Sequence, residues 1–317
     1  MADFDVLCVG LAVADVMAKP IDDIPDWDRL ATFDHIEHHT GGCAVNTAVD
    51  LVRLGMPAAV SACLGCDGAG AFVRQSLAAA GVDTTGLVET DAASTSYTFV
   101  MIGSDGRRRY LHHVGTNAHL TDADVPDELI ARARLLHVGG SLLMPALDGE
   151  PTARLLARAR KLGVDTSLDT AFNPNVDARA LIEPCLPHLD LFIPSTEEAQ
   201  AITGEREPEA MLDWFGAGRV SVLGIKLGAE GCILRAGGET TRYPAFQVKV
   251  VDGSGAGDAF MAGFLYGTLQ GWDTGRTARF ANATAAHCIR AIGCSAGVPS
   301  AEQVARFLAG NPPLRGA

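Results

Sequence analysis

The chain has 317 residues and a formal net charge of −13, and this acidic balance argues against nucleic acid or an anionic membrane as its main partner. Its hydrophobic content of 48% suits a soluble α/β protein with a sizeable core, built as one large domain or two. We find neither a signal peptide nor an apolar run long enough to span a membrane, and the cysteines are scattered as in reduced cores, so we expect a cytoplasmic protein.

Short runs typical of buried strands alternate with longer runs of helical spacing through most of the chain. In chain order, the predicted strands are 6–10, 58–64, 135–139, 164–169, 189–194 and 220–226. The predicted helices are 44–54, 71–80, 151–162, 196–203, 259–269 and 277–291. This alternation predicts an α/β fold with a mostly parallel sheet and helices on both of its faces.

Two segments interrupt this alternation. Residues 13–40 contain no good helix, and residues 94–114 have the pattern of a polar hairpin that turns at Ser104-Asp105-Gly106. We expect both segments to form a small β-sheet lid over the ligand crevice that open α/β sheets have at the carboxyl ends of their strands. The remaining segments, 1–12, 41–93 and 115–317, would then form the α/β core.

Three glycines within five residues, Gly253, Gly255 and Gly257, precede the predicted helix 259–269. Because glycine has no Cβ, the backbone N–H groups here can turn toward one point, and such a nest at a helix start binds anions. Asp258 in the first turn would face the anion, and a phosphate held beside a carboxylate suggests phosphoryl transfer. The alternative is a glycine-rich turn in which Asp258 only caps the helix. The spacing matches neither a Walker-type phosphate loop nor a dinucleotide fingerprint.

Several motifs together resemble one family. Residues 41–48, continuing to Arg53-Leu54-Gly55, resemble the N-terminal signature of the ribokinase-like (PfkB) carbohydrate kinases, and residues 252–258 resemble their C-terminal signature. Shorter family motifs stand at 64–70, 195–198 and 226–231, so the resemblance covers about residues 5–300. It implies a doubly wound α/β domain with a β-sheet lid, ATP bound near the C-terminal half, and a sugar-like alcohol beneath the lid.

The resemblance also implies roles for individual residues. Asp258 matches the family's catalytic base, and we expect its place near a helix N-terminus to keep it ionised with a low pKa. The anion hole would consist of Gly255, Ala256 and Gly257. The matching substrate-binding residues are Asp15, Gly41, Gly42 and Asn46. Asp15 as a plain turn residue and Asn46 as a plain helix-start residue are the structural alternatives.

The implied nucleotide and cation sites involve a second group of positions. The residues that match nucleotide-binding positions are Ser195, Lys226, Gly228 and Asn282. Ser195 and Lys226 depart from the family's Asn and Thr, and one hypothesis is that Lys226 supplies a positive charge to the ATP phosphates. Glu198 would organise Mg²⁺ through waters, unless it is only a surface glutamate. A monovalent cation such as K⁺ would be held by backbone carbonyls of Asp252, Ser254, Cys288, Ala291, Gly293 and Gly297.

The charged residues of the lid permit two interpretations. Arg107, Arg108 and Arg109 could bind an anionic substrate, but alternation on a hairpin points Arg108 away from the other two, and we favour a solvated face. The histidines of the lid are expected at its surface or at the substrate rather than on a metal. Because a small sheet leaves an edge to be covered, a homodimer through the lid is also expected.

Together these features predict an ATP- and Mg²⁺-dependent kinase that phosphorylates a primary hydroxyl of a free sugar. The enzymatic alternative is a nucleoside kinase of the same family. It would need an apolar or aromatic slot for the base, and the lid offers Phe33, Tyr97, Phe99 and Tyr110. The alternative from another class is a non-catalytic member that senses a sugar or nucleotide.

Overall fold

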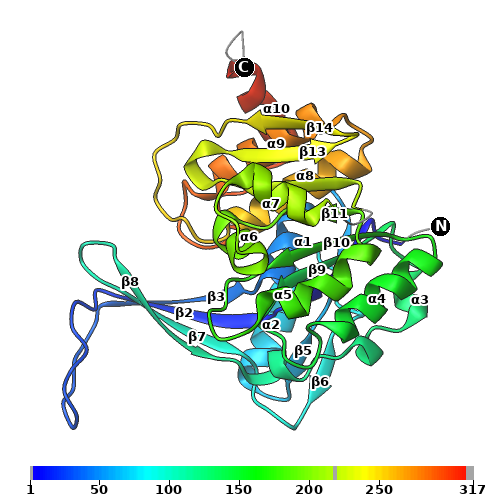
Figure 1. The fold of residues 1–317 in the computed structure, drawn as a ribbon. Coiled ribbons are helices and arrows are strands. Elements are labelled where there is room, and N and C mark those ends of the chain that lie inside the picture. The colour runs from blue at the N-terminus through cyan, green and yellow to red at the C-terminus, as the bar shows by residue number, and fades with distance from the viewer. Residues whose placement is uncertain (1–2, 217–219, 312–317) are drawn as a thin grey trace.

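The computed structural model of the chain describes residues 3–216 and 220–311. Its main sheet has eight strands in the order β14-β13-β12-β11-β10-β9-β1-β4 (Figure 1). The parallel strands are β1 (Val6–Gly10), β4 (Ala58–Ser61), β9 (Leu135–Ser141), β10 (Asp165–Thr170), β11 (Leu191–Phe192) and β12 (Val222–Lys226). An antiparallel hairpin of β13 (Cys232–Ala236) and β14 (Glu239–Tyr243) completes one edge.

Helices cover both faces of this sheet. They are α1 (Cys43–Leu54), α2 (Gly68–Ala79), α3 (Asp127–Ile130), α4 (Glu150–Lys161), α5 (Ala178–Ile182), α6 (Thr196–Thr203), α7 (Pro208–Phe215), α8 (Ala256–Leu269), α9 (Thr274–Cys288) and α10 (Ala301–Gly310). Successive side chains of β1 enter opposite cores, Val6 with α1, α8 and α9 and Leu7 with α4 and α7. A sheet buried on both faces in this way is the predicted doubly wound α/β fold, which is therefore confirmed.

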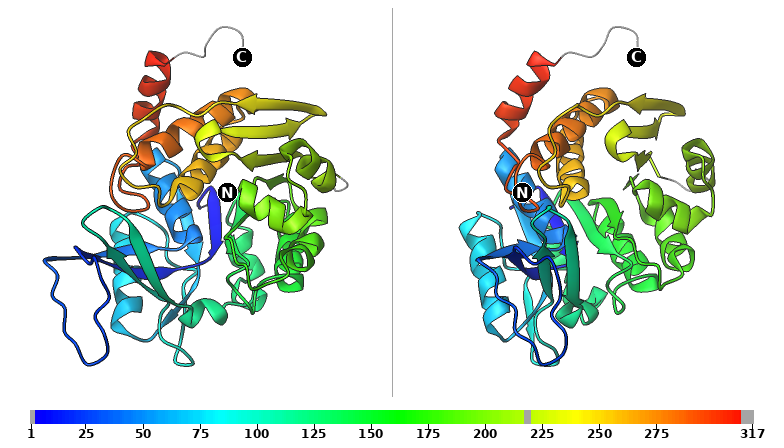
Figure 2. Two further views of the ribbon diagram at one scale, coloured as in Figure 1. Left: turned by 60° about the vertical axis from the view of Figure 1, so that its left-hand side comes forward. Right: turned by 90° about the vertical axis from the view of Figure 1, so that its left-hand side faces the viewer.

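A second, smaller sheet projects from the core (Figure 2). Its order is β3-β2-β7-β8, formed by β2 (Val13–Lys19), β3 (His35–Gly41), β7 (Tyr97–Ile102) and β8 (Arg108–His113). β2 pairs antiparallel with β3 and parallel with β7, and β7 pairs antiparallel with β8. These strands come from the two segments in which we expected the lid. The predicted hairpin 94–114 is β7 and β8.

The predicted elements differ from the structure in several places. The predicted strand 58–64 is divided, because β5 (Cys63–Gly65) leaves the main sheet and pairs with β6 (Val88–Thr90). The sequence interpretation missed α3, α5, α7, α10 and the hairpin of β13 and β14. Short 3₁₀ turns lie at Gly115–Ala118, Asp122–Asp124, Glu183–His188 and Gly228–Glu230. Within the described ranges, no helix is both long enough and apolar enough to cross a membrane.

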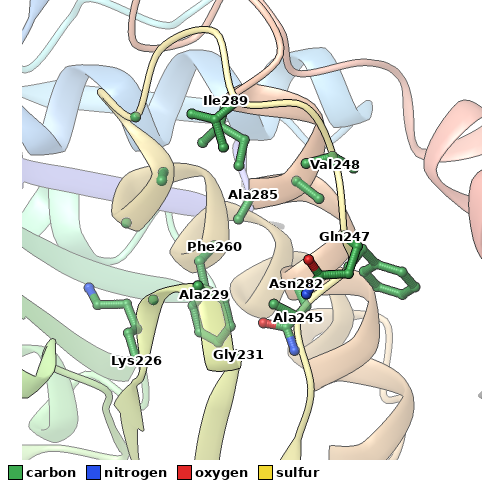
Figure 3. Close-up of a pocket in the computed structure, with 17 residues that line it drawn as sticks. Lys226, Ala229, Gly231, Ala245, Gln247, Val248, Phe260, Asn282, Ala285 and Ile289 are labelled. Carbon is green, nitrogen blue, oxygen red and sulfur yellow. The ribbon is translucent and has the colours of Figure 1, made fainter.

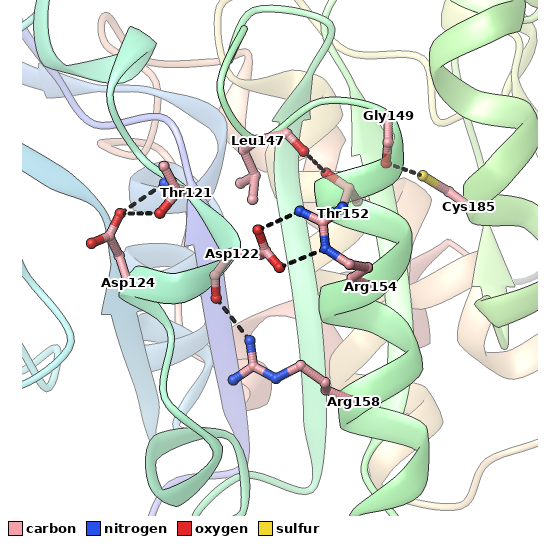
Figure 4. A network of polar contacts seen from close by, with 9 residues as sticks. All are labelled: Thr121, Asp122, Asp124, Leu147, Gly149, Thr152, Arg154, Arg158 and Cys185. Atoms are coloured by element: carbon pink, nitrogen blue, oxygen red, sulfur yellow. Dashed lines mark hydrogen bonds and ion pairs between the residues drawn. The ribbon is translucent and has the colours of Figure 1, made fainter.

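A network of polar contacts connects α4 and its N-cap with two 3₁₀ turns, Asp122–Asp124 and Glu183–His188 (Figure 4). Arg154 pairs with the Asp122 carboxylate at 2.9 Å, and Arg158 donates to the Asp122 carbonyl at 2.8 Å. The Cys185 thiol donates to the carbonyl of Gly149 at 3.6 Å. Every group in this network has a partner within the protein, so the network accounts for the position of α4 without a ligand.

Candidate active site

The N-terminal turns of α1 and α8 bring the two family signatures together. The side-chain amide of Asn46 on α1 donates to Oδ2 of Asp258 on α8 at 2.7 Å, across 212 positions of sequence. Both residues are buried. Because an amide N–H bonded to a carboxylate fixes its direction, Asn46 holds the Asp258 carboxylate in one orientation.

The loop before α8 has the geometry of an anion site. Gly255 is the N-cap of α8 and has φ of +73°, and a Cβ at this position would lie 2.1 Å from the carbonyl oxygen of Cys294. Glycine is therefore required here. No side chain caps the helix start, so the first-turn amide of Gly257 remains for an external acceptor, and the amide of Ala256 makes only a long 3.5 Å contact with the carbonyl of Gly253.

The environment of Asp258 changes one expectation from the sequence. Burial raises the pKa of Asp258 to about 6, although the hydrogen bond from Asn46 and the positive charge of Lys226 lower it. The expectation of a low pKa at the helix start is therefore wrong, because removal from water outweighs the helix dipole. The carboxyl remains mostly ionised at neutral pH, and a base with a pKa near the working pH is well placed to exchange a proton.

The predicted substrate-binding residues meet where the small sheet joins the core. Asp15 lies on β2 rather than in a turn after β1, and a Cβ on Gly41 would lie 2.1 Å from its carboxylate. Gly42 has φ of +97°, and its Cβ would lie 2.3 Å from the carbonyl oxygen of Leu11. Gly41 thus lets β3 approach the Asp15 carboxylate closely, and Gly42 lets the start of α1 approach the backbone of Leu11. Burial raises the pKa of Asp15 to about 6, against a hydrogen bond from Thr98.

We call residues 252–257, which precede and begin α8, the anion loop. A cavity of about 360 Å³ opens beside it (Figure 3). Its wall includes Lys226, Gly228, Phe260 and Asn282, together with Ala256 and Gly257 of the helix start. Asn282 is buried, not exposed, and its amide donates to the carbonyl of Tyr243 at 3.1 Å. A mostly apolar cavity that ends on backbone amides suits a flat ring followed by phosphates. Ser195 is not part of this wall.

Lys226 has a partner that sequence reasoning did not identify as a site residue. Its ammonium contacts both carboxylate oxygens of Asp169 at 2.7 and 2.8 Å, and both side chains are buried. Burial raises the pKa of Asp169 to about 7, while Lys226 lowers it. A Cβ on Gly257 would lie 3.5 Å from the Lys226 nitrogen, so the ion pair borders the anion loop.

Ser195 and Glu198 bond to each other at the start of α6. The Ser195 amide donates to the Glu198 carboxylate at 2.7 Å, and the Glu198 amide donates to the Ser195 hydroxyl at 3.4 Å. This is a capping box, and Glu198 is buried, so the alternative of a surface glutamate is wrong. Across residues 3–216 and 220–311, no group of three or more His, Cys, Asp or Glu side chains is arranged to hold a metal ion directly.

The residues predicted to hold a monovalent cation lie around one turn. Gly293 donates its amide to Oδ2 of Asp252 at 2.9 Å, and the Cys288 thiol lies 3.0 Å from the carbonyl of Cys294 and 3.5 Å from that of Ser254. The amide of Ala291 contacts the carbonyl of Cys288, and a Cβ on Gly297 would lie 2.5 Å from that same oxygen. The predicted positions are therefore neighbours in space.

The expected exposure of one arginine in the small sheet is wrong. Arg107 and Arg109 are exposed, as expected, but Arg108 pairs with Asp252 at 2.7 Å and is largely buried. Alternation along β8 correctly separated Arg108 from the other two arginines. The interpretation of a solvated face is wrong for Arg108, because the side of β8 that carries it faces the anion loop.

Comparisons with known proteins identify the family and the fold. The chain matches the pfkB family carbohydrate kinases over residues 3–301. It is 27% identical to the nucleoside kinase of Methanothermobacter thermautotrophicus, over 97% of this chain and 96% of that one. It is 30% identical to the 2-dehydro-3-deoxygluconokinase of Bacillus subtilis, over 84% and 86%. An E. coli structure of the same fold, solved in complex with ATP and Mg²⁺, superposes with a TM-score of 0.82 at 22% identity, over 97% and 100%.

Proposed function

We propose that this chain, which belongs to the pfkB family of ATP-dependent carbohydrate kinases, transfers the γ-phosphoryl group of ATP to a primary hydroxyl of a free sugar. The observation that carries the proposal is the 2.7 Å contact between Asn46 and Asp258. It joins the buried carboxylate at the start of α8 to the first turn of α1, which follows Gly41 and Gly42 at the end of β3. ATP and Mg²⁺, both bound in the E. coli structure of this fold, are the proposed cofactors.

In the proposed reaction, the sugar hydroxyl oxygen bonds to the γ-phosphorus as the bond from that phosphorus to the leaving oxygen of ADP breaks. Asp258 accepts the hydroxyl proton and later releases it to solvent. The first-turn amides of α8 stabilise the negative charge on the transferring group. Asp15 and Asn46 would bind neighbouring hydroxyls, since carboxylate and amide oxygens accept hydrogen bonds from them.

The nucleotide would occupy the cavity of Figure 3, with its ring near Asn282 and its phosphates toward Gly257. Bound Mg²⁺ would reduce the negative charge that the triphosphate presents to the attacking hydroxyl. Glu198 is the candidate to orient it through waters. Its carboxylate already accepts one backbone hydrogen bond, which leaves other lone pairs for water.

A nucleoside kinase is the second candidate, and the similarity to a nucleoside kinase over nearly the whole chain favours it. The free sugar is supported by the exposure of two of the four aromatic side chains that could form a slot for a base, whereas Tyr97 and Phe99 on β7 are half-buried. Phe33 and Tyr110 are 39% and 58% exposed, so neither forms a closed slot for a base.

The test is ATP-dependent ADP release with Mg²⁺ against a panel of free pentoses, hexoses, sugar acids and nucleosides. We expect turnover with a subset of the sugars, and mass spectrometry should show one added phosphoryl group on that sugar. Turnover with nucleosides alone would replace the first candidate with the second. Bound ATP without turnover on any member of the panel would contradict both.

A further inference from the structure

Arg108 joins the small sheet to the anion loop. It lies on β8, and its guanidinium contacts Oδ1 of Asp252 at 2.7 Å and the hydroxyl of Ser254 at 2.6 Å. The Asp252 side chain is 1% exposed and that of Arg108 is 16% exposed. These contacts link residues 146 positions apart in the chain, so they depend on how the small sheet sits against the core.

Both oxygens of the Asp252 carboxylate accept hydrogen bonds from groups of the protein. Oδ1 also accepts the amide of Ser254 at 2.9 Å, and Oδ2 accepts the amide of Gly293 at 2.9 Å. Although burial raises the pKa of Asp252, these contacts together with Arg108 lower it to about 2. The carboxylate is therefore ionised at any working pH, and the charge that balances it is the guanidinium of Arg108.

The predicted monovalent-cation site does not fit an added cation in this arrangement. Asp252 is the one carboxylate among its predicted positions, and its charge is already neutralised by Arg108. The thiol of Cys288 lies 3.5 Å from the carbonyl of Ser254, a second predicted ligand, and 3.0 Å from the carbonyl of Cys294. A K⁺ ion held by these carbonyls would lie close to the guanidinium of Arg108, which has the same sign of charge.

We propose that Arg108 supplies, from the small sheet, the positive charge that orders the anion loop, so that phosphoryl transfer in this protein needs no monovalent cation. The inference rests on the proposed kinase function and adds to it a positioning residue. Asp252 comes directly before Gly253 and the helix start, so any shift of this carboxylate moves the amides that would bind the phosphoryl group. The anion loop is then complete only when the small sheet is docked on it.

The experiment compares the wild type with Arg108→Gln and with Arg109→Gln, the exposed neighbour on the same strand. Turnover is measured in KCl and in choline chloride of equal ionic strength. We expect the wild type to differ by less than about twofold between the salts. In choline we expect Arg108→Gln to lose roughly 10² in kcat through a misplaced anion loop, with a KM for the sugar close to that of the wild type. K⁺ should restore part of that loss, and Arg109→Gln should behave as the wild type.

Three results would overturn the proposal. One is a wild-type enzyme that K⁺ activates tenfold or more. Another is an Arg108→Gln variant that matches Arg109→Gln in both salts. The third is a variant whose only change is a higher KM for the sugar, which would make Arg108 a contact to an anionic substrate. Should Arg108→Gln fold poorly, Arg108→Lys keeps the charge and is expected to retain cation-independent turnover.

A second readout separates this inference from the kinase proposal. Thermal unfolding in the same two salts needs no turnover, so it tests Arg108 even if no panel substrate reacts. We expect K⁺ to raise the melting temperature of Arg108→Gln but not that of the wild type or of Arg109→Gln. Equal shifts in all three proteins would contradict the assignment of Arg108, whereas absent turnover with the expected shifts would contradict only the kinase proposal.

Discussion

Asp258 owes its proposed role to its surroundings rather than to its type. Burial raises its pKa to about 6, and Asn46 and Lys226 lower it from what burial alone would give. The neutral carboxyl is thus favoured more than in water, and the carboxylate persists because the Asn46 amide donates to it and the positive charge of Lys226 lies nearby. An acid in this environment can take up a proton near neutral pH and release it again.

The pKa of Asp258 predicts the acid limb of the pH–rate profile. A base must be ionised to accept a proton, so kcat/KM should fall about tenfold per pH unit below about pH 6. Asn46→Ala removes a donor that stabilises the carboxylate, so the limb of this variant should move to higher pH. A wild-type limb centred below pH 5, or an unchanged limb in Asn46→Ala, would contradict the assignment.

Some site residues could be predicted from the sequence and others could not. Asp258, Asn46 and Gly255 lie in local motifs whose residue types already suggest an anion site and polar contacts. Asp169 and Arg108 could not be found in this way, because their partners lie 57 and 146 positions away. An ion pair between such distant residues leaves no mark in either local sequence.

Lys226 can be tested against its structural partner. We expect Lys226→Met to raise the KM for ATP about tenfold or more, since it removes a charge beside the anion loop. The substitution also leaves the Asp169 carboxyl buried without its counter-charge, which should cost up to about 3–5 kcal/mol of stability and less once the carboxyl takes up a proton.

The double variant Lys226→Met with Asp169→Asn serves as the control for this loss of stability. It should recover much of the melting temperature but not the affinity for ATP. An unchanged KM for ATP in the double variant would show that Lys226 only balances Asp169.

At the scale of elements, the start of α8 is built around one glycine. We expect Gly255→Ala to lower the free energy of unfolding by about 1–3 kcal/mol from backbone strain alone, with a further cost from the contact with Cys294. Turnover should fall roughly 10²-fold, because the first-turn amides would move. Urea unfolding and steady-state kinetics measure the two effects.

Gly253 in the same loop is the matched control. A Cβ at this position has no heavy atom within 4 Å, so Gly253→Ala should change stability by less than about 0.5 kcal/mol. Equal effects of the two substitutions would contradict the view that the backbone conformation at position 255 forms the anion site.

Most of the longer helices were predictable, but α7 and α10 were missed although α7 begins at Pro208 and α10 has a capping box formed by Ser300 and Gln303. Helices α1, α4, α6, α8 and α9 were predicted close to their observed bounds. The missed helices α3 and α5 span four and five residues, too short to show a helical period. The hairpin of β13 and β14 did have a signal in the sequence, the pair Gly237-Gly238. Both glycines have positive φ in the structure, as a two-residue hairpin turn requires.

At the scale of the molecule, the loop that connects β2 and β3 of the small sheet has exposed apolar side chains. Trp27 and Leu30 are 95% and 91% exposed, and they lie in the long loop between β2 and β3 that stands away from the body in Figures 1 and 2. Exposed apolar groups beside an open strand edge favour association. We therefore propose a homodimer formed through the small sheets.

Light scattering after size exclusion tests this dimer. The wild type should have about twice the chain mass of 33.1 kDa, and Trp27→Asp with Leu30→Asp should have the mass of one chain. Leu162→Asp, at an exposed position that follows α4, is the control and should leave the dimer intact. A wild-type monomer at micromolar concentration would contradict the proposal.

The most direct test of the central claim is a comparison of the wild type with Asp258→Asn on the sugar that the panel identifies. Asparagine keeps the size of the side chain but cannot accept the hydroxyl proton as a base. We expect kcat to fall roughly 10²–10⁴-fold, while calorimetry shows ATP bound with an affinity within about threefold of the wild type. Retained turnover in Asp258→Asn would contradict the account, because the proton would then leave by another route.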